Sequence, residues 1–165
     1  MNSQQIKEIL LSEIHEVSIN YEKYCNDPKR DFSRKRKLPF ELMLKNIIGM
    51  GSKSITNELI DIFQASGEMP STSAFVQQRT KIRPEALKAV FDGFMSRILA
   101  SADKMRILAV DGSDIQIETN PKDKTSHIST SIDKKSFNLL HLNALYDLEE
   151  HVYTDAIIQA AKSQN

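Results

Sequence analysis

The sequence predicts an α+β protein with a helical region followed by a shorter strand-rich region. Up to about residue 103, apolar side chains recur at the spacing of amphipathic helices. From residue 104 onwards, short apolar runs and alternating patterns are typical of strands. The 165 residues have room for one ordinary domain or two small ones. We therefore expect a helical domain over 1–103 and a second domain over 104–165.

Five helices are expected in the first region. Four of them carry a clear apolar face, and Pro39 and Pro84 stand where a first helical residue is favoured. Gly49 and Gly51 end the second helix, and Gly93 inside the fifth is expected to cost about 1 kcal/mol against alanine. The expected helices span about 4–17, 39–48, 54–64, 73–82 and 84–99.

Three strands in a meander are expected in the second region. Ile107–Val110 is a short apolar run that suits a strand buried on both faces. The following Asp111–Asp114 segment is expected to end this run, with Gly112 permitting a turn and Asp114 serving as a cap or turn acid. Residues 118–136 are expected to form a loop, and residues 159–165 a tail without a partner. The second and third strands are expected at Phe137–Tyr146 and Val152–Ile158.

Charge and composition exclude several classes of protein. The single cysteine cannot form an internal disulfide, and the four histidines lack the spacing of a zinc site. No apolar run approaches the ~18 residues that a membrane helix needs, so we expect a soluble, cytoplasmic protein without a membrane partner. Lysine plus arginine equal aspartate plus glutamate at 22 each, but residues 107–165 carry five basic and nine acidic side chains. The basic charge is concentrated earlier in the chain.

Two groups of residues are candidates for binding nucleic acid. The first is a basic run that could contact phosphates through counterion release, or could be a solvated linker. Its members are Lys29, Arg30, Arg34, Lys35, Arg36 and Lys37. The second is the polar helix over 73–82. It could be the recognition helix of a helix–turn–helix-like arrangement, with side chains suited to base edges, or it could be an ordinary surface helix. Its members are Gln77, Gln78, Arg79 and Lys81.

Several sequence blocks, taken in order, resemble the insertion-sequence type 4 family of DDE transposases. Two blocks lie in the helical region and three in the strand region, and together they cover most of residues 30–160. They are RKRKLPF (34–40), SAFVQQR with IRPEA (73–79 and 82–86), AVDGS (109–113), HLNALYD (141–147) and YTDAIIQ (153–159).

This resemblance implies a fold, a chemistry and a partner. The second region would be the first three strands of a ribonuclease-H-like catalytic domain, and the helical region would help to bind the ends of the element. The family holds Mg²⁺ with two aspartates and a glutamate, and Asp111 matches the first aspartate. No position of this chain matches the other two, because the chain stops before them. We therefore expect an incomplete catalytic domain that neither cuts nor joins DNA alone.

Three functions follow from these observations. The first is the N-terminal portion of a transposase that binds double-stranded DNA at the inverted repeats, in a bacterial cytoplasm and associated with the nucleoid. The second is a non-catalytic DNA-binding product that competes with the full-length transposase. The third is an interaction module, in which the apolar stripe of Leu87–Leu99 pairs with another helix, including one of a second copy.

Overall fold

The chain is α+β, with helices in one compact unit and an antiparallel sheet in the other. The computed structural model describes residues 2–34, 37–64, 66–67, 69–100, 105–129 and 135–160. The units are Met1–Ala102 and Asp103–Asn165, whereas the sequence placed the boundary between residues 103 and 104. Each unit is described by itself below.

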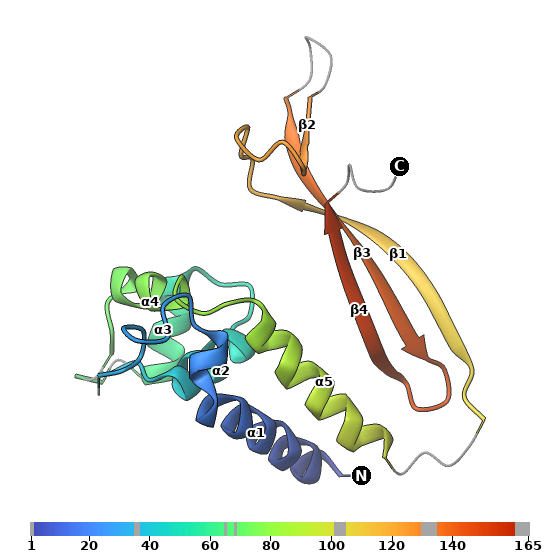
Figure 1. Ribbon diagram of the computed structural model, residues 1–165, viewed down its shortest axis with the longest axis horizontal. Helices are drawn as coiled ribbons and strands as arrows, with labels where there is room; N and C mark the ends of the chain where they lie inside the picture. Colours follow the sequence, from blue (N-terminus) through green and yellow to red (C-terminus); the bar gives the residue numbers. More distant parts are fainter. Residues whose placement is uncertain are drawn as a thin grey trace. The chain divides into compact units, whose positions relative to one another are not determined.

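Five α-helices form the first unit (Figure 1). Side-chain caps fix several of their starts: Asn2 and Gln5 form a capping box, and Ser54 and Ser71 each accept a backbone N–H of the following turn. Each expected helix is present within a few residues of its predicted ends. Their bounds are α1 Ser3–Ile19, α2 Phe40–Gly49, α3 Ile55–Phe63, α4 Thr72–Arg79 and α5 Glu85–Leu99, with the 3-10 helix η1 at Tyr21–Tyr24.

Helix α2 joins two neighbouring cores of the helical unit. Phe40 and Leu44 of α2 belong to a cluster with α1 and α5, while Met43 belongs to a cluster with α3 and α4. The amphipathic spacing of α2 places these side chains on its buried side. The first cluster consists of Ile14, Val17, Cys25, Phe40, Leu44, Ala86 and Val90. The second consists of Leu38, Met43, Leu59 and Phe75.

Helices α1 and α5 pack side by side (Figure 1), and Gly93 is required at their contact. The carboxylate of Glu13, a buried residue, forms an ion pair with Arg97 and occupies the space beside Gly93. A Cβ at position 93 would lie 2.9 Å from Glu13 Cδ, closer than real side chains allow. Besides the expected cost in helix propensity, the glycine therefore leaves room for a buried carboxylate, which the sequence did not indicate.

The apolar stripe of α5 is used inside the helical unit. Ala86, Val90 and Met95 are buried, and Val90 packs against Ile14 of α1. Leu87, at the start of the stripe, remains 36% exposed. Most of the surface that the interaction-module hypothesis needed is thus already covered by the protein's own helices.

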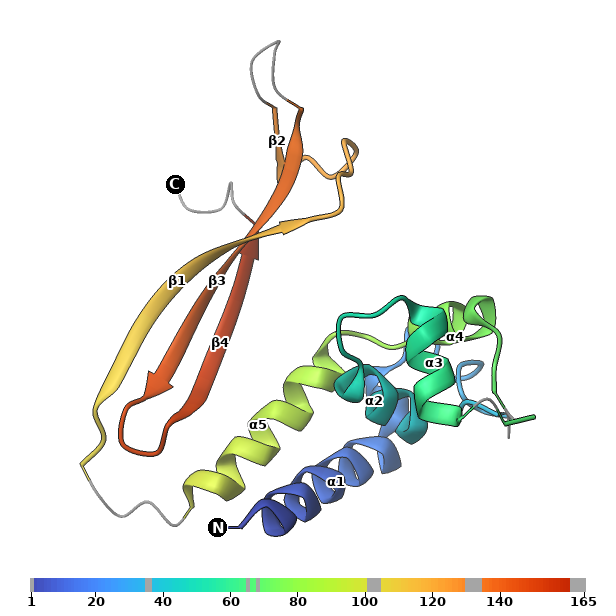
Figure 2. The ribbon, with the colours of Figure 1, turned by 180° about the vertical axis from the view of Figure 1, so that it is seen from behind.

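The second unit contains a four-stranded antiparallel sheet (Figure 2). Strand β3 is central: β1 pairs with one edge along its whole length, and β4 pairs with the other. This arrangement confirms the expected meander of three long strands. The strands are β1 Leu108–Ile117, β2 His127–Ile128, β3 Phe137–Asp147 and β4 Val152–Ala160.

Strand β1 does not end at Asp111, as the sequence predicted. It runs through the Asp-Gly-Ser-Asp segment without a turn, and none of the described glycines has a positive φ. Asp111 pairs with Ala144, and Asp114 pairs with His141 and accepts a hydrogen bond from its ring at 2.9 Å. Continuous pairing with β3 outweighs the low strand propensity of these residues. Asp111 therefore lies in the middle of a strand, and Asp114 is not a turn residue.

Two expectations for the loop and the tail were also wrong in part. The loop over 118–136 contains β2, whose His127 pairs with Asn138 of β3. Strand β4 continues beyond Ile158, because Gln159 and Ala160 pair with β3. Asn138 is fully buried and its amide hydrogen-bonds to the Asn120 carbonyl and the Ser126 hydroxyl, which fastens the loop to the sheet.

Asp147 fixes the turn between β3 and β4. Its side chain is fully buried, accepts the backbone N–H groups of Glu149 and Glu150, and pairs with Arg106 at 2.5 Å. These bonds favour the carboxylate, so the pKa of Asp147 is lowered, first by the Glu150 N–H and next by Arg106. The side chain of Asp147 thus stabilises the turn that joins the second and third expected strands.

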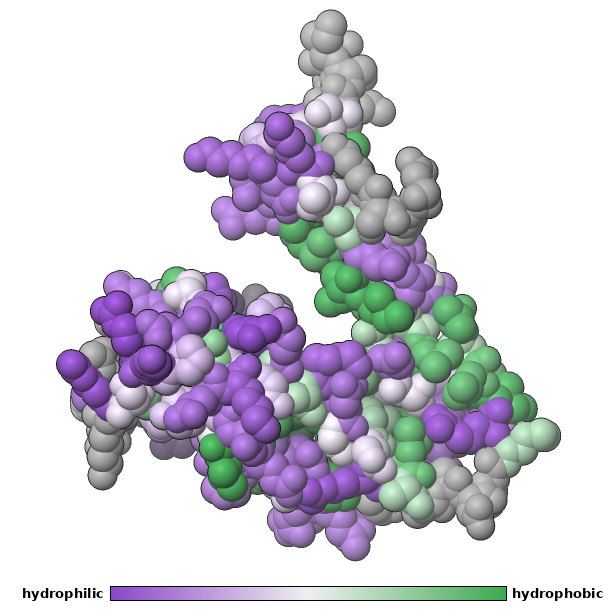
Figure 3. Space-filling view, viewed as in Figure 1, coloured by the Kyte–Doolittle hydropathy of each residue, from purple (hydrophilic) through white to green (hydrophobic). Residues whose placement is uncertain are grey.

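Both faces of the sheet carry exposed apolar side chains. Figure 3 shows some of them as green areas over the strands on the side turned to the viewer. Val110 is 73% exposed on one face, and Ile158 is 63% exposed on the other. Among the described residues, no helix combines the length and the apolar character that a membrane crossing requires.

Candidate nucleic-acid interface

A short backbone pairing brings the basic segment beside α4. Cys25 and Ile82 form an antiparallel bridge, and the Arg83 N–H donates to the Tyr24 carbonyl at 2.8 Å. The side chain of Asn26 adds a hydrogen bond to the Thr80 carbonyl at 2.7 Å. The segment that begins at Asn26 is therefore held against the turn that follows α4, although 54 positions separate Asn26 from Thr80 in the sequence.

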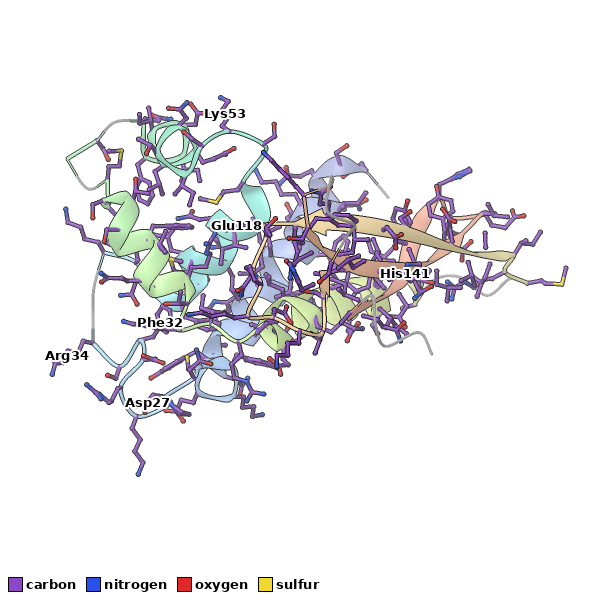
Figure 4. All side chains as sticks on the ribbon, turned by 90° about the horizontal axis from the view of Figure 1, so that it is seen from above. Asp27, Phe32, Arg34, Lys53, Glu118 and His141 are labelled. Atoms are coloured by element: carbon purple, nitrogen blue, oxygen red, sulfur yellow. The ribbon has the colours of Figure 1, made fainter. Side chains whose placement is uncertain are left out.

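Phe32 anchors the basic segment to the helical core. Its ring packs edge-on against Phe40 with centroids 5.1 Å apart, and it contacts both apolar clusters. Its φ of 56° is rare for a residue with a bulky side chain. In Figure 4, Phe32 lies among the helices, whereas Arg34 extends away from them. The ring of Phe32 is thus partly buried, while the neighbouring Arg30 and Arg34 remain exposed.

Two adjoining hollows result from this arrangement. The first, called here the basic hollow, has a volume of about 280 Å³ and is lined by Lys29, Arg30, Phe32, Ser33, Arg34, Leu38, Gln78 and Lys81. The second, called the α4 hollow, has a volume of about 430 Å³ and lies along one side of α4. Its lining is Lys37, Leu38, Met69, Pro70, Ser71, Ala74, Gln77, Gln78 and Lys81. Leu38, Gln78 and Lys81 line both hollows, so the two form one surface.

The described residues that line this surface carry a net positive charge, although Asp27 and Asp31 lie in the same segment as Lys29 and Arg30. Among the described residues that line the two hollows, none is an aspartate or a glutamate. Within the described ranges, no salt bridge involves Lys29, Arg30 or Arg34. The Lys81 ammonium donates to the neutral amide oxygen of Gln78 at 2.9 Å, which positions it without removing its charge. The surface is electrostatically suited to an anionic ligand.

Most of the residues that the sequence proposed for DNA binding meet at this surface. Lys35 and Arg36 lie outside the described residues. Arg79 is exposed but lines neither hollow. The residues that line the hollows are Lys29, Arg30, Arg34, Lys37, Gln77, Gln78 and Lys81. The two candidate groups of the sequence therefore form a single site.

Gln78 has a different place from the one expected for a base-reading residue. It is 8% exposed, and its amide oxygen is occupied by Lys81. Gln77 is exposed and its amide donates to Ser73 Oγ at 3.4 Å. Of the candidate residues on α4, Gln77 and Arg79 face solvent, while the buried Gln78 accepts a hydrogen bond from Lys81.

Sequence reasoning missed the apolar part of the site. Phe32 lies inside the basic run, and an aromatic residue among cations is a signal that this segment is anchored. Met69 and Pro70 line the α4 hollow just before the N-cap of α4. Their place at the hollow depends on the connection between Gln64 and Ser71, and no local sequence pattern predicts that place. This connection is also longer than the three or four residues of a standard helix–turn–helix.

Asp111 belongs to the second unit and lines neither hollow. Its side chain is exposed and accepts the backbone N–H of Gly112 at 2.9 Å. In the described strands, the register places no other carboxylate on its face of the sheet, since Asp114 and Asp155 both project from the opposite face. The described residues also contain no group of three or more potential metal ligands. Asp111 offers one oxygen ligand, and these residues do not complete a Mg²⁺ site around it.

Cys25 lies beneath the site as a packing residue. It is buried, and burial, followed by the nearby Asp31 and Glu22 charges, raises the pKa of its thiol to about 11. A thiol with this pKa is almost entirely protonated at neutral pH and is a poor nucleophile. Its side chain packs in the first apolar cluster, and its backbone pairs with Ile82.

The chain matches no protein-family model, and neither curated proteins nor solved structures show a significant similarity to it.

Proposed function

We propose that this chain binds duplex DNA through the surface formed by the basic hollow and the α4 hollow. The observation that carries the proposal is the meeting of five cationic side chains from two distant segments, with no acid among the described lining residues. Phosphate contacts by lysine and arginine supply most of the affinity of proteins for DNA. These cations are Lys29, Arg30, Arg34, Lys37 and Lys81.

Helix α4 is the element we propose to face the bases. A helix fits into the major groove, where amide and guanidinium side chains distinguish base pairs. Gln77 and Arg79 are exposed on α4 and have suitable groups. Gln78 is a positioning residue for Lys81 in this proposal, because its amide oxygen is already engaged.

In the wider proposal, the chain is part of a DDE transposase that resembles the insertion-sequence type 4 family, and the DNA is the inverted repeat of its element. The order of β1, β3 and β4 as an antiparallel meander is compatible with the opening strands of a ribonuclease-H-like sheet. Asp111 on β1 would be the first of three carboxylates. Mg²⁺ held by a complete set would stabilise the attacking and leaving oxygens.

A DNA-binding chain without cleavage is the second candidate function. It is favoured by the isolation of Asp111 from other carboxylates on its face of the sheet in the described strands. We expect the purified protein to bind duplex DNA and to leave it uncut in the presence of Mg²⁺. Strand cleavage that requires Mg²⁺ and disappears in Asp111→Ala would contradict this expectation.

The salt dependence of binding tests the DNA-binding proposal. If the five cations each neutralise one phosphate, the slope of log K against log salt is about −4.5. Lys29→Gln is expected to reduce the magnitude of the slope by about 0.9. Lys7→Gln is the matched control, because Lys7 is an exposed lysine of α1 outside both linings. Fluorescence anisotropy of a labelled duplex measures both values, and a slope near zero would refute the proposal.

A further inference from the structure

The two hollows differ in chemistry, and this difference indicates what each one binds. The basic hollow has four cations in its lining and only two apolar side chains, Phe32 and Leu38. The α4 hollow adds Met69, Pro70 and Ala74 and has two cations, Lys37 and Lys81. A base needs apolar or aromatic faces on which to stack, whereas a phosphate needs cationic donors. The basic hollow therefore favours a phosphate.

The size of the basic hollow restricts the ligand further. At about 280 Å³ it admits a single chemical group that projects from DNA, but not the duplex itself. Its cations come from two sides, since Lys29, Arg30 and Arg34 belong to the anchored segment and Lys81 follows α4. A group that enters the hollow is thus approached by cations from two segments of the chain.

The charge of the hollow distinguishes between the two kinds of DNA phosphate. An internal phosphodiester carries one negative charge and two free oxygens, whereas a terminal monoester carries nearly two charges at pH 7 and three free oxygens. Four cations, with no acid among the described lining residues, match the more highly charged group better. We propose that the basic hollow binds the terminal phosphate monoester of a DNA strand end.

This inference rests on the proposed function, because it assumes that the same surface binds duplex DNA. It adds that the protein recognises the end of a DNA strand as well as the sugar–phosphate backbone. Lys81 is the central residue: the buried Gln78 holds its ammonium in place, and this partner carries no charge that would compete with a phosphate. Arg34 is exposed and supplies a planar guanidinium that can bind two phosphate oxygens at once.

The test compares duplexes of one sequence that differ only at the strand end. The full chain is titrated into labelled duplexes that carry a 5′ hydroxyl, a 5′ phosphate or a 3′ phosphate, with anisotropy as the readout. A duplex with a terminal phosphate is expected to bind at least about tenfold more tightly than the hydroxyl duplex, from one or two additional charge-assisted hydrogen bonds. The preference is expected to shrink as the pH falls through about 6, where the monoester loses its second charge.

Three variants locate the effect. Lys81→Gln and Arg34→Gln are expected to abolish the preference for a terminal phosphate, and Lys7→Gln is expected to retain it. Circular dichroism confirms that each variant is folded, and Arg34, as an exposed residue, gives a second variant if Lys81→Gln does not fold. Inorganic phosphate at millimolar concentration is expected to weaken the preference in the wild-type protein.

The outcomes separate the inference from the proposed function. Equal binding of the hydroxyl and phosphate duplexes would overturn the inference and leave DNA binding intact. A preference that persists in both hollow variants would also overturn it, because the phosphate would then bind elsewhere. Failure of every duplex to bind would refute the proposed function itself, and the inference with it.

Discussion

Replacing Phe32 tests whether this residue anchors the basic segment. Complete burial of a phenylalanine makes its replacement by alanine cost about 3–5 kcal/mol, and Phe32 is only partly buried. Its edge-on contact with Phe40 contributes about 1 kcal/mol of the total. We therefore expect Phe32→Ala to lower the free energy of unfolding of the helical unit by about 2 kcal/mol.

The backbone at Phe32 makes a second variant informative. Because its φ is 56°, glycine adopts this conformation without the penalty of about 1–2 kcal/mol that other residues incur. Phe32→Gly is therefore expected to be about 1 kcal/mol more stable than Phe32→Ala. Where φ is negative, glycine has no such advantage over alanine. A glycine variant that is more stable than the alanine variant would therefore indicate a left-handed backbone at position 32.

Urea unfolding followed by helical circular dichroism measures these differences in the full chain. Both variants are also expected to bind DNA more weakly under conditions where they are folded, since the cations on either side of Phe32 lose their fixed position. A loss below about 0.5 kcal/mol for Phe32→Ala, which is typical of surface substitutions, would refute the anchoring. An alanine variant more stable than the glycine variant would refute the left-handed backbone.

Three further predictions concern stability and binding. Gly93→Ala is expected to destabilise the helical unit by about 2–3 kcal/mol, because the new methyl group displaces the buried Glu13 carboxylate. In the Glu13→Ala background the same substitution is expected to be neutral or stabilising. Urea unfolding of the wild type, the two single variants and the double variant measures the coupling between the two positions, and a Gly93→Ala effect that is the same in both backgrounds would contradict the contact. Hydrogen bonds, first from the Ser126 hydroxyl, lower the pKa of Asp123 to about 2, so its contribution to stability is complete above about pH 4. That contribution is lost progressively as the pH falls through about 2, and most of the unfolding difference between wild type and Asp123→Asn is expected to be gone there; a difference constant from pH 5 to pH 2 would contradict the linkage. Arg79→Ala is expected to relax sequence preference in DNA competition assays, whereas an equal loss of affinity for all sequences would show a contact to the backbone.

Patterns that depend on neighbouring residues were predictable from the sequence. The apolar faces and caps of α2 and α3 lie within single segments, and both helices were expected close to their observed bounds. The interruption predicted at Asp111 was wrong because the strand is stabilised by pairing with β3, which begins 20 residues after β1 ends. The contact of Gly93 with Glu13 could not be predicted either, because Glu13 lies on another helix that is distant in the sequence.

The candidate site was predictable in its residues but not in its shape. The basic run and the polar helix were each visible as local clusters of side chains. Their meeting depends on the bridge between Cys25 and Ile82, which joins two segments without any sequence signal of their pairing. The burial of Gln78 likewise depends on tertiary packing and on its bond to Lys81.

Mapping the DNA contacts on the protein tests the central claim most directly. Backbone amide resonances of the full chain, recorded during titration with a duplex, report which residues meet the ligand. The account predicts that the changes concentrate at residues 29–34 and at Gln77 to Lys81, and that Lys81→Gln diminishes them. Changes confined to the strands between residues 108 and 160, with the helical unit unaffected, would contradict it.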